Sequence, residues 1–231
     1  METVSSPFSR FISLVGEESF HDLSSRSVLV VGVGGVGGYV VEGLVRSGIG
    51  HIIIIDGDVV DVSNINRQII ALHSTIGESK VEVFKKRILD INPNCQVESI
   101  SNFLTKDNIC MLEALSFDFL VDACDMVSTK KEIISYCKKR DIPFLTCLGT
   151  AKKLDPSMLE VTTIDKTYND PLARILRHYV KEERLERVVC LFSRELPKKI
   201  PELGSSAFVP SSAGLMIAGY VVNYFMTQKK K

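Results

Sequence analysis

The glycine-rich stretch from Val28 to Gly38, with the sequence VLVVGVGGVGG, constrains the fold of this chain more than any other segment. Its four leading apolar residues are typical of a buried strand, and apolar residues at helical spacing follow the glycines until Gly48 can end the helix. A turn between a strand and a helix start offers backbone N–H groups and the positive end of the helix dipole to a phosphate. The stretch therefore predicts a nucleotide-binding turn. A tight turn that only packs the helix against the strand is the alternative.

An acidic residue follows at the distance that a ribose site requires. The run HIIIID ends at Asp56, 18 residues after Gly38, and its apolar part predicts a second strand. An acid at the end of that strand can accept hydrogen bonds from ribose hydroxyl groups. The glycines and Asp56 together favour a bound nucleotide, but they do not distinguish a dinucleotide from ATP.

Beyond this unit the chain alternates helices with strands. The patterns predict helices over 77–91, 106–115 and 129–139, and strands over 96–100, 118–125 and 142–147. That alternation is typical of an α/β fold with a Rossmann-like, doubly wound and mainly parallel sheet. We expect a single domain over 1–231, in which 1–150 form the nucleotide-binding core and 151–231 form a C-terminal α/β extension.

Two helices dominate the C-terminal extension. A basic helix is predicted over 171–187 and an apolar helix over 211–226, with strands over 158–165 and 188–192. The apolar run contains Tyr220 and Asn223 and is short for a bilayer span, so we expect a helix of the core or of a dimer interface and no membrane span. The first ten residues are polar and lack the apolar centre of a signal peptide, which predicts a cytoplasmic protein.

Charge is distributed unevenly along the chain, although the net charge is zero. Residues 169–231 carry 11 Lys and Arg against 6 Asp and Glu. In the predicted basic helix, cations at spacings of three, four and three share one face, namely Arg174, Arg177, Lys181 and Arg184. This face fits an anionic partner, and an ordinary solvated helix surface is the alternative.

Polar residues follow the second strand, where ligands bind in open α/β sheets. The segment after Asp56 carries Asp58, Asn64 and Arg67, and the next helix has Lys80 near its start. The helix dipole disfavours a cation in the first turn, so the phosphates of a ligand are one explanation for Lys80. A solvated loop and a surface lysine are the alternatives.

Several motifs together resemble the ubiquitin-activating-enzyme-like superfamily of ATP-dependent adenylating proteins. The superfamily motifs are GVGGVGG, IDGDVVDVSNINRQI, GESKVE, INPN and VDACD. Further segments are similar to the branch of dehydratases that act on threonylcarbamoyladenosine in tRNA, namely NINRQI, LDPSMLEV, KTYNDPLARILR and FVPSSAGLMIA. The similarity covers nearly the whole chain from about Arg10. None of the six cysteines forms the Cys-x-x-Cys pairs that sulfur-carrier-activating branches usually use for zinc.

This resemblance implies an adenylation reaction. In the superfamily, ATP is cleaved at its α-phosphate and a carboxylate becomes an acyl adenylate. The dehydratase branch implies that the carboxylate belongs to the threonylcarbamoyl group of the tRNA, and that ring closure then expels AMP with net loss of water. The implied cofactors are ATP and Mg²⁺, and a monovalent cation is a further candidate. The implied partners are tRNA and a second copy of the chain, with 151–231 serving substrate and dimer contacts.

The resemblance also implies roles for individual residues. Asp56 matches the acid that holds the ribose, and Asp125 matches the acid associated with Mg²⁺ and catalysis. Arg10 matches an arginine that the partner subunit of a homodimer supplies. The remaining matched residues face the ATP phosphates, with Asp58 as a weaker candidate nearby: Gly32, Gly34, Gly35, Gly37, Asn64, Arg67 and Lys80.

Three other functions remain open on the sequence alone. The first is adenylation of the C-terminal carboxylate of a ubiquitin-like or sulfur-carrier protein, which would make such a protein the partner. The second is a nicotinamide-dependent oxidoreductase, which the glycines and Asp56 permit but which leaves Arg67, Lys80 and Asp125 unexplained. The third is a nucleotide-binding protein without catalytic activity.

Overall fold

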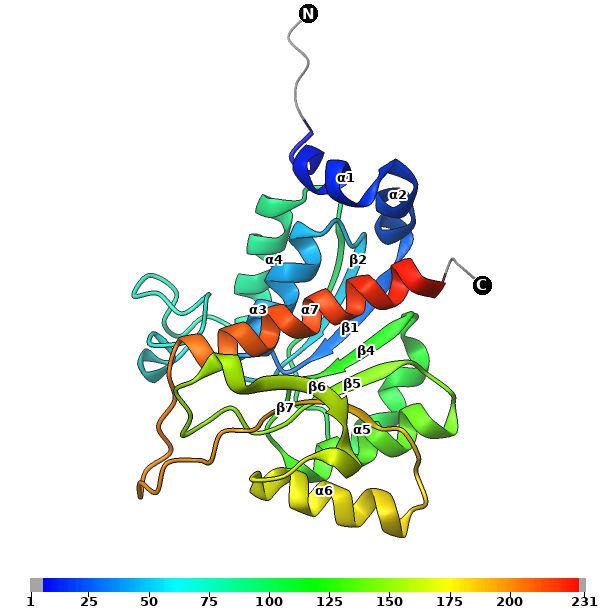
Figure 1. The fold of residues 1–231 in the computed structure, drawn as a ribbon. Helices are drawn as coiled ribbons and strands as arrows, with labels where there is room; N and C mark the ends of the chain where they lie inside the picture. Colours follow the sequence, from blue (N-terminus) through cyan, green and yellow to red (C-terminus); the bar gives the residue numbers. More distant parts are fainter. Residues whose placement is uncertain (1–5, 229–231) are drawn as a thin grey trace, which may run out of the picture.

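A seven-stranded sheet with the strand order β3-β2-β1-β4-β5-β7-β6 forms the centre of the protein (Figure 1). The computed structural model describes residues 6–228. The strands are β1 (Ser27–Val31), β2 (His51–Ile55), β3 (Gln96–Ile100), β4 (Phe119–Asp122), β5 (Phe144–Cys147), β6 (Leu159–Thr163) and β7 (Val189–Ser193). All neighbouring strands pair in parallel except β6, which is antiparallel to β7. The prediction of a Rossmann-like, mainly parallel sheet is therefore confirmed.

Helices cover both faces of the sheet. One face carries α2 (Glu17–Ser25), α3 (Gly37–Arg46), α4 (Lys80–Ile91) and α7 (Phe208–Gln228), and α1 (Ser9–Val15) packs on α2. The other face carries the 3₁₀ helix η2 (Lys106–Ala114), α5 (Val127–Lys139) and α6 (Pro171–Glu182). Short 3₁₀ turns complete the chain, namely η1 (Val62–Asn64), η3 (Pro156–Met158) and η4 (Ile164–Lys166).

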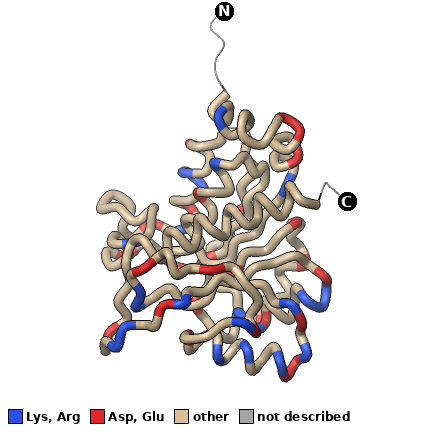
Figure 2. Tube along the Cα trace, viewed as in Figure 1, with Lys and Arg blue, Asp and Glu red and all other residues tan. Residues whose placement is uncertain are grey.

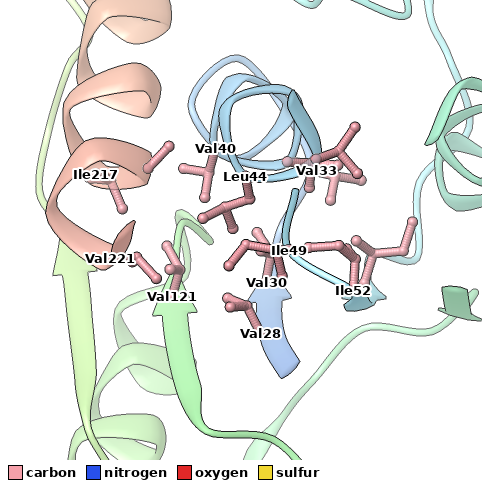
Figure 3. Close-up of a cluster of buried hydrophobic side chains, with 14 of the residues drawn as sticks. Val28, Val30, Val33, Val40, Leu44, Ile49, Ile52, Val121, Ile217 and Val221 are labelled. Atoms are coloured by element: carbon pink, nitrogen blue, oxygen red, sulfur yellow. The ribbon is translucent and has the colours of Figure 1, made fainter. Parts of the chain in front are cut away.

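The two helical layers explain why the central strands β1 and β2 are apolar at nearly every position. In β1, Val28 and Val30 pack in the cluster with α3 and α7 (Figure 3). Leu29 and Val31 pack in the cluster with α5 on the other face. A parallel strand that is buried on both faces has no polar face and reads as a continuous apolar run. The short apolar run in the sequence is therefore a reliable signal for the central strand.

The helix α7 lies across the sheet beside α3 (Figure 1). It approaches the start of α3 so closely that a Cβ atom on Gly214 would lie 2.4 Å from the carbonyl oxygen of Val36. Among residues 6–228, α7 is the one helix long and apolar enough to cross a bilayer, yet half of its apolar window is buried inside the protein. Ile217 and Val221 are fully buried, as in the core helix that the sequence predicts.

Several element bounds differ from the sequence-based expectations, and four of these differences change how a segment is interpreted. The segment predicted as a helix over 106–115 is a 3₁₀ helix, and α4 begins at Lys80 because Gly77 adopts a positive φ of 86°. The basic helix ends at Glu182, where the Leu185 N–H bonds to the Val180 carbonyl and Arg184 is left-handed (φ 54°), a closure typical of helix ends. Arg184 is therefore not on the predicted helical face.

The fourth difference concerns the strand predicted to end at Asp125. The strand β4 ends at Asp122, whose carboxylate accepts hydrogen bonds from the Cys124 N–H at 3.2 Å and the Cys124 thiol at 3.0 Å. These bonds fold the chain back on itself, so that residues 123–126 form a loop rather than an extension of the strand. Asp125 is therefore a loop residue.

Candidate functional site

A cleft with a volume of about 610 Å³ lies at the carboxyl ends of the parallel strands. Its wall includes residues that directly follow β1, β2, β3, β4 and β5, in agreement with the position of ligand sites in open α/β sheets. The polar and glycine residues among those that line it are Gly32, Gly34, Gly35, Asp56, Asp58, Arg67, Gln68, Lys80, Asn102, Asp125, Gly149, Thr150 and Ser205.

The glycine turn forms one wall of the cleft. Gly32 has a positive φ of 82°, and a Cβ atom there would lie 2.9 Å from the carbonyl oxygen of Ala123. The helix α3 begins at Gly37 without a side-chain N-cap. An uncapped helix start beside a cleft leaves backbone N–H groups and the positive end of the dipole available to an anion.

Asp56 fixes the shape of this turn. Its carboxylate, 8% exposed, accepts a hydrogen bond from the Val33 N–H at 2.8 Å and another from the Asp58 N–H at 2.9 Å. An ionised carboxylate has about four acceptor positions, so capacity remains for hydroxyl groups in the cleft. Asp56 thus both shapes the glycine turn and remains available as a ribose acceptor.

Two cations reach the cleft from the segment after β2. Lys80 is 4% exposed, and its ammonium group lies 2.7 Å from a carboxylate oxygen of Asp58. The Arg67 guanidinium donates to the carbonyl of Ser63 at 2.8 Å and to Asn66 Oδ1 at 2.9 Å. The pairing with Asp58 explains how a lysine can be buried in the first turn of α4, because a buried charge must be paired.

Gln68 is a site residue that the sequence analysis does not single out. Its side chain lines the cleft and is only 6% exposed, and its Oε1 atom has no hydrogen-bond partner among the described residues. A buried polar atom without a partner is unfavourable and indicates a missing ligand or water. The one signal in the sequence is its position next to Arg67 in the NINRQI motif.

Three residues of the predicted set do not line this cleft. Gly37 is buried against the turn itself, because a Cβ atom there would lie 1.8 Å from the carbonyl oxygen of Gly32. Asn64 accepts a hydrogen bond from the Asp61 N–H at 3.2 Å and caps η1. Arg10 is exposed on α1, and α1 and α2 lie beside the amino ends of the strands, away from the cleft (Figure 1).

Asp125 lies in the wall of the cleft opposite the residues after β2, in the loop between β4 and α5. Beneath this loop, Lys130 and Asp122 form an ion pair with an Nζ–Oδ2 distance of 3.1 Å, and both are fully buried. Burial of the ammonium group opposes its ionisation, but the attraction of Asp122 outweighs this effect, and the pKa of Lys130 lies above its ordinary value.

The cysteines of the cleft are not activated. Burial, reinforced by the Asp122 carboxylate, raises the pKa of Cys124 far above its ordinary value, and burial raises the pKa of Cys147 to about 12. The thiolate is the nucleophilic form of cysteine, so neither side chain is a nucleophile at neutral pH.

The acids of the cleft fit a magnesium ion that shares its ligands with a nucleotide. Among the described residues there is no cluster of three His, Cys, Asp or Glu side chains that could hold a metal by itself. Magnesium commonly uses one or two carboxylates together with substrate phosphates, and Asp125 can supply one carboxylate.

Taken together, the strand order, the glycine turn with Asp56, and the two cations and the acid that line one cleft define a Rossmann-like protein with a site for a phosphorylated nucleotide. The chain belongs to the ThiF family, whose model matches residues 8–227.

Several proteins similar to this chain are dehydratases. The chain is 39% identical to a protein of Bacillus subtilis named tRNA threonylcarbamoyladenosine dehydratase, over 93% of this chain and 92% of that protein. It is 41% identical to the enzyme of that name from Escherichia coli, over 74% of this chain and 63% of that protein. The crystal structure of the Escherichia coli enzyme in complex with ATP superposes with a TM-score of 0.93 at 34% identity, covering 100% of this chain and 98% of that chain.

Proposed function

We propose that this protein is an ATP-dependent dehydratase that cyclises threonylcarbamoyladenosine in tRNA through an acyl adenylate. The observation that carries the proposal is the cleft, because it combines an uncapped glycine turn with two cations and an acid. The chain is also similar to such dehydratases over nearly its full length. In this proposal 1–150 supply the nucleotide core, 151–231 serve the tRNA and the dimer, and the location is the cytoplasm, where both substrates occur.

The proposed reaction has two steps. A carboxylate oxygen of the threonylcarbamoyl group attacks the α-phosphorus of ATP, and pyrophosphate leaves. A nucleophilic atom of the same modified base then attacks the activated carbonyl carbon, and AMP leaves with the former carboxylate oxygen, so the net change is loss of one water. Activation is needed because a free carboxylate is a poor electrophile, whereas AMP is a good leaving group.

The residues of the cleft serve the first step. Arg67 and Lys80 stabilise the negative charge that develops on the transferring phosphoryl group and on pyrophosphate. The Lys80 ammonium group pairs with Asp58, and it can contact the phosphates if it gives up part of that pairing when they bind. Asp56 receives the ribose hydroxyl groups, and Asp125 would hold Mg²⁺, which neutralises phosphate charge when bound. A monovalent-cation requirement stays a prediction without assigned ligands.

The reaction itself is the first test. We expect that the protein, incubated with ATP, Mg²⁺ and unfractionated tRNA that carries threonylcarbamoyladenosine, will produce a nucleoside lighter by one water, detected by mass spectrometry after digestion. Omission of ATP is the control and should leave the nucleoside unchanged. Pyrophosphate exchange that depends on a ubiquitin-like or sulfur-carrier protein, without any change in the tRNA, would support the carrier-adenylating alternative instead.

We further expect ATP with Mg²⁺ to bind far more tightly than NAD. A nicotinamide dinucleotide has no γ-phosphate. Arg67 and Lys80 would therefore contact fewer phosphate oxygens, and a metal ion held by Asp125 would have fewer phosphate ligands. Calorimetric titrations with each nucleotide measure the difference. Tighter binding of NAD would favour the oxidoreductase alternative.

The tRNA is proposed to contact the exposed cations of α6. Arg177 is unsuited to this role, because its guanidinium donates to the Thr167 carbonyl at 2.7 Å and to the Thr167 hydroxyl at 2.8 Å. Arg174 and Lys181 are exposed on the same helix. Figure 2 shows acidic residues close to the cations along this part of the chain. The three terminal lysines that contribute to the charge asymmetry lie outside the described residues.

We therefore expect the double variant with Arg174→Ala and Lys181→Ala to have a higher apparent KM for tRNA. The slope of log affinity against log salt concentration should become less steep by about one unit for each phosphate that the protein no longer binds. ATP affinity should not change, since neither residue lines the cleft. Lys86→Ala is a control, because Lys86 is exposed on α4, on the opposite face of the sheet. Weaker ATP binding with unchanged tRNA affinity would refute the assignment.

Dimerisation is proposed because α1 and α7 expose large apolar side chains. Leu215 on α7 is 51% exposed and Leu14 on α1 is 80% exposed, and α1 has no buried residue. Since Arg10 lies far from the cleft of its own chain, it can reach a nucleotide only in the partner subunit.

If Arg10 acts across the interface, two inactive chains should restore each other. We expect Arg10→Ala protein mixed with Asp125→Asn protein to recover activity, because each mixed dimer contains one site with both residues intact. Activity is measured after subunit exchange has been demonstrated with labelled chains. Continued inactivity in exchanged dimers would show that Arg10 does not complete the partner's site.

A further inference from the structure

The buried ion pair of Lys130 and Asp122 is attached directly to the loop that carries Asp125. Lys130 Nζ lies 3.1 Å from each carboxylate oxygen of Asp122, and the Thr146 hydroxyl donates to Asp122 Oδ2 at 2.5 Å. Both charged residues and Thr146 are 0% exposed. The carboxylate also accepts from the N–H and the thiol of Cys124, as described above. These hydrogen bonds hold the Asp122 carboxylate in the interior, so it cannot turn toward the cleft.

The same pair fixes both sides of Asp125. On the amino side, Cys124 is held by Asp122, and on the carboxyl side, the Lys130 side chain ties the start of α5 to the same carboxylate. The loop also supports the glycine turn, since the Ala123 carbonyl would lie only 2.9 Å from a Cβ atom on Gly32. The position of Asp125 relative to the glycine turn thus depends on the buried pair.

Stability alone does not explain a lysine at this position. A cation in the first turn of a helix opposes the helix dipole, and a buried ion pair is often no more stabilising than apolar residues of the same volume. An apolar pair at 122 and 130 would fill the space, but it would leave the Cys124 N–H without its acceptor. The arrangement is suited to holding a loop in one conformation.

We propose that Lys130, acting through Asp122, is a positioning residue that orients the Asp125 carboxylate toward the metal ion and the phosphates of ATP. This inference rests on the proposed function, since it assumes the magnesium role of Asp125. It predicts that loss of the Lys130–Asp122 pair lowers kcat only when Asp125 is present.

A double-mutant cycle tests this dependence. The variant Asp122→Asn with Lys130→Met removes both charges together, so that no uncompensated charge is left buried. We expect this variant to unfold in a cooperative thermal transition and to bind metal-free ATP with unchanged affinity. Mg²⁺ should no longer increase its affinity for ATP. Its kcat should be lower by a factor on the order of a hundred, as for a displacement of about 1 Å. In an Asp125→Asn background the same changes should cause no further loss of kcat.

The second buried lysine–aspartate pair is a matched control. Lys153 and Asp170 are 2% and 5% exposed, their charged atoms are 3.5 Å apart, and Lys153 donates to the Gly149 carbonyl in the cleft wall at 2.6 Å. Lys153→Met with Asp170→Asn should keep the gain in ATP affinity from Mg²⁺, and any loss of kcat should multiply with that of Asp125→Asn, as for independent sites.

The outcomes separate the inference from the proposed function. If Asp125→Asn alone keeps the full Mg²⁺-dependent gain in ATP affinity, the magnesium role fails and this inference fails with it. If Asp125→Asn removes the gain but the changes at 122 and 130 still reduce kcat by the same factor in that background, only the inference is overturned. Should the double variant not fold, Thr146→Val removes one hydrogen bond to Asp122 and is measured in the same cycle.

Discussion

Asp125→Asn is expected to reduce kcat by a factor on the order of a thousand while the fold remains intact. The amide has nearly the shape of the carboxylate, so the packing of the loop after β4 should not change. What is lost is the negative charge that would hold Mg²⁺ against the phosphates in the cleft. Initial rates of AMP formation at saturating ATP and tRNA measure the effect, and the thermal transition reports the fold.

The matched control is Asp90→Asn, because Asp90 is exposed on α4 and does not line the cleft. This variant loses one negative charge at the surface, where a single substitution usually changes stability by less than about 0.5 kcal/mol. Its kcat should equal that of the unchanged protein. Near-normal turnover of Asp125→Asn would remove Asp125 from the site and would leave the cleft without an assigned metal ligand.

The central fold could be predicted because its signals are local. The apolar run of β1, the glycines and the run of β2 each specify their own structure, and the parallel pairing of β1 with β2 follows from the helix between them. Asp56 could also be placed, since its position is fixed by the end of β2. The cleft at the carboxyl ends of the strands then follows from the topology.

The buried ion pair could not be predicted, because it depends on contacts between distant segments. Asp122 and Asp125 are both acids at the end of one apolar run, and the sequence does not say which of them faces the cleft. Lys130 has the spacing of an ordinary helix residue and pairs with Asp122 only once α5 packs against the sheet. The predicted end of β4 is three residues too late for the same reason.

Two other differences have separate causes. The basic helix is predicted to extend to 187 because apolar and charged periodicity continues past Glu182, whereas the left-handed closure at Arg184 depends on one hydrogen bond between Leu185 and Val180. Gln68 escapes prediction because its polar character is ordinary in a loop, and only the fold shows that it is buried in the wall of the cleft.

Gly37 illustrates that a glycine of a nucleotide-binding turn can also be required for packing. The resemblance implies that Gly37 faces the ATP phosphates, which stays a prediction, and the structure shows that it packs against Gly32, where even a methyl group would overlap the backbone. The turn needs glycine at this position for the close approach of α3 to the end of β1. Gly34 and Gly35, by contrast, line the cleft itself.

Gly37→Ala is therefore expected to destabilise the protein by about 3 kcal/mol or more, because overpacking against backbone atoms cannot be relieved by a side-chain rotation. The added Cβ atom would lie 1.8 Å from the Gly32 carbonyl oxygen and 3.2 Å from the Cβ atom of Ala123, so both the glycine turn and the loop before Asp125 must shift. ATP binding should be lost together with stability. Chemical denaturation measures the first effect, and calorimetry with ATP measures the second.

Gly34→Ala is the matched control for steric overlap. A Cβ atom on Gly34 would lie 3.6 Å from Gln68 Nε2, an ordinary van der Waals distance, so the free energy of unfolding should remain close to that of the unchanged protein. The methyl group would nevertheless stand in the cleft, where a phosphate must approach the backbone, and ATP should bind more weakly. Equal stability of the two variants would show that Gly37 does not govern the packing of α3. Unchanged ATP affinity of Gly34→Ala would show that the phosphates lie elsewhere in the cleft.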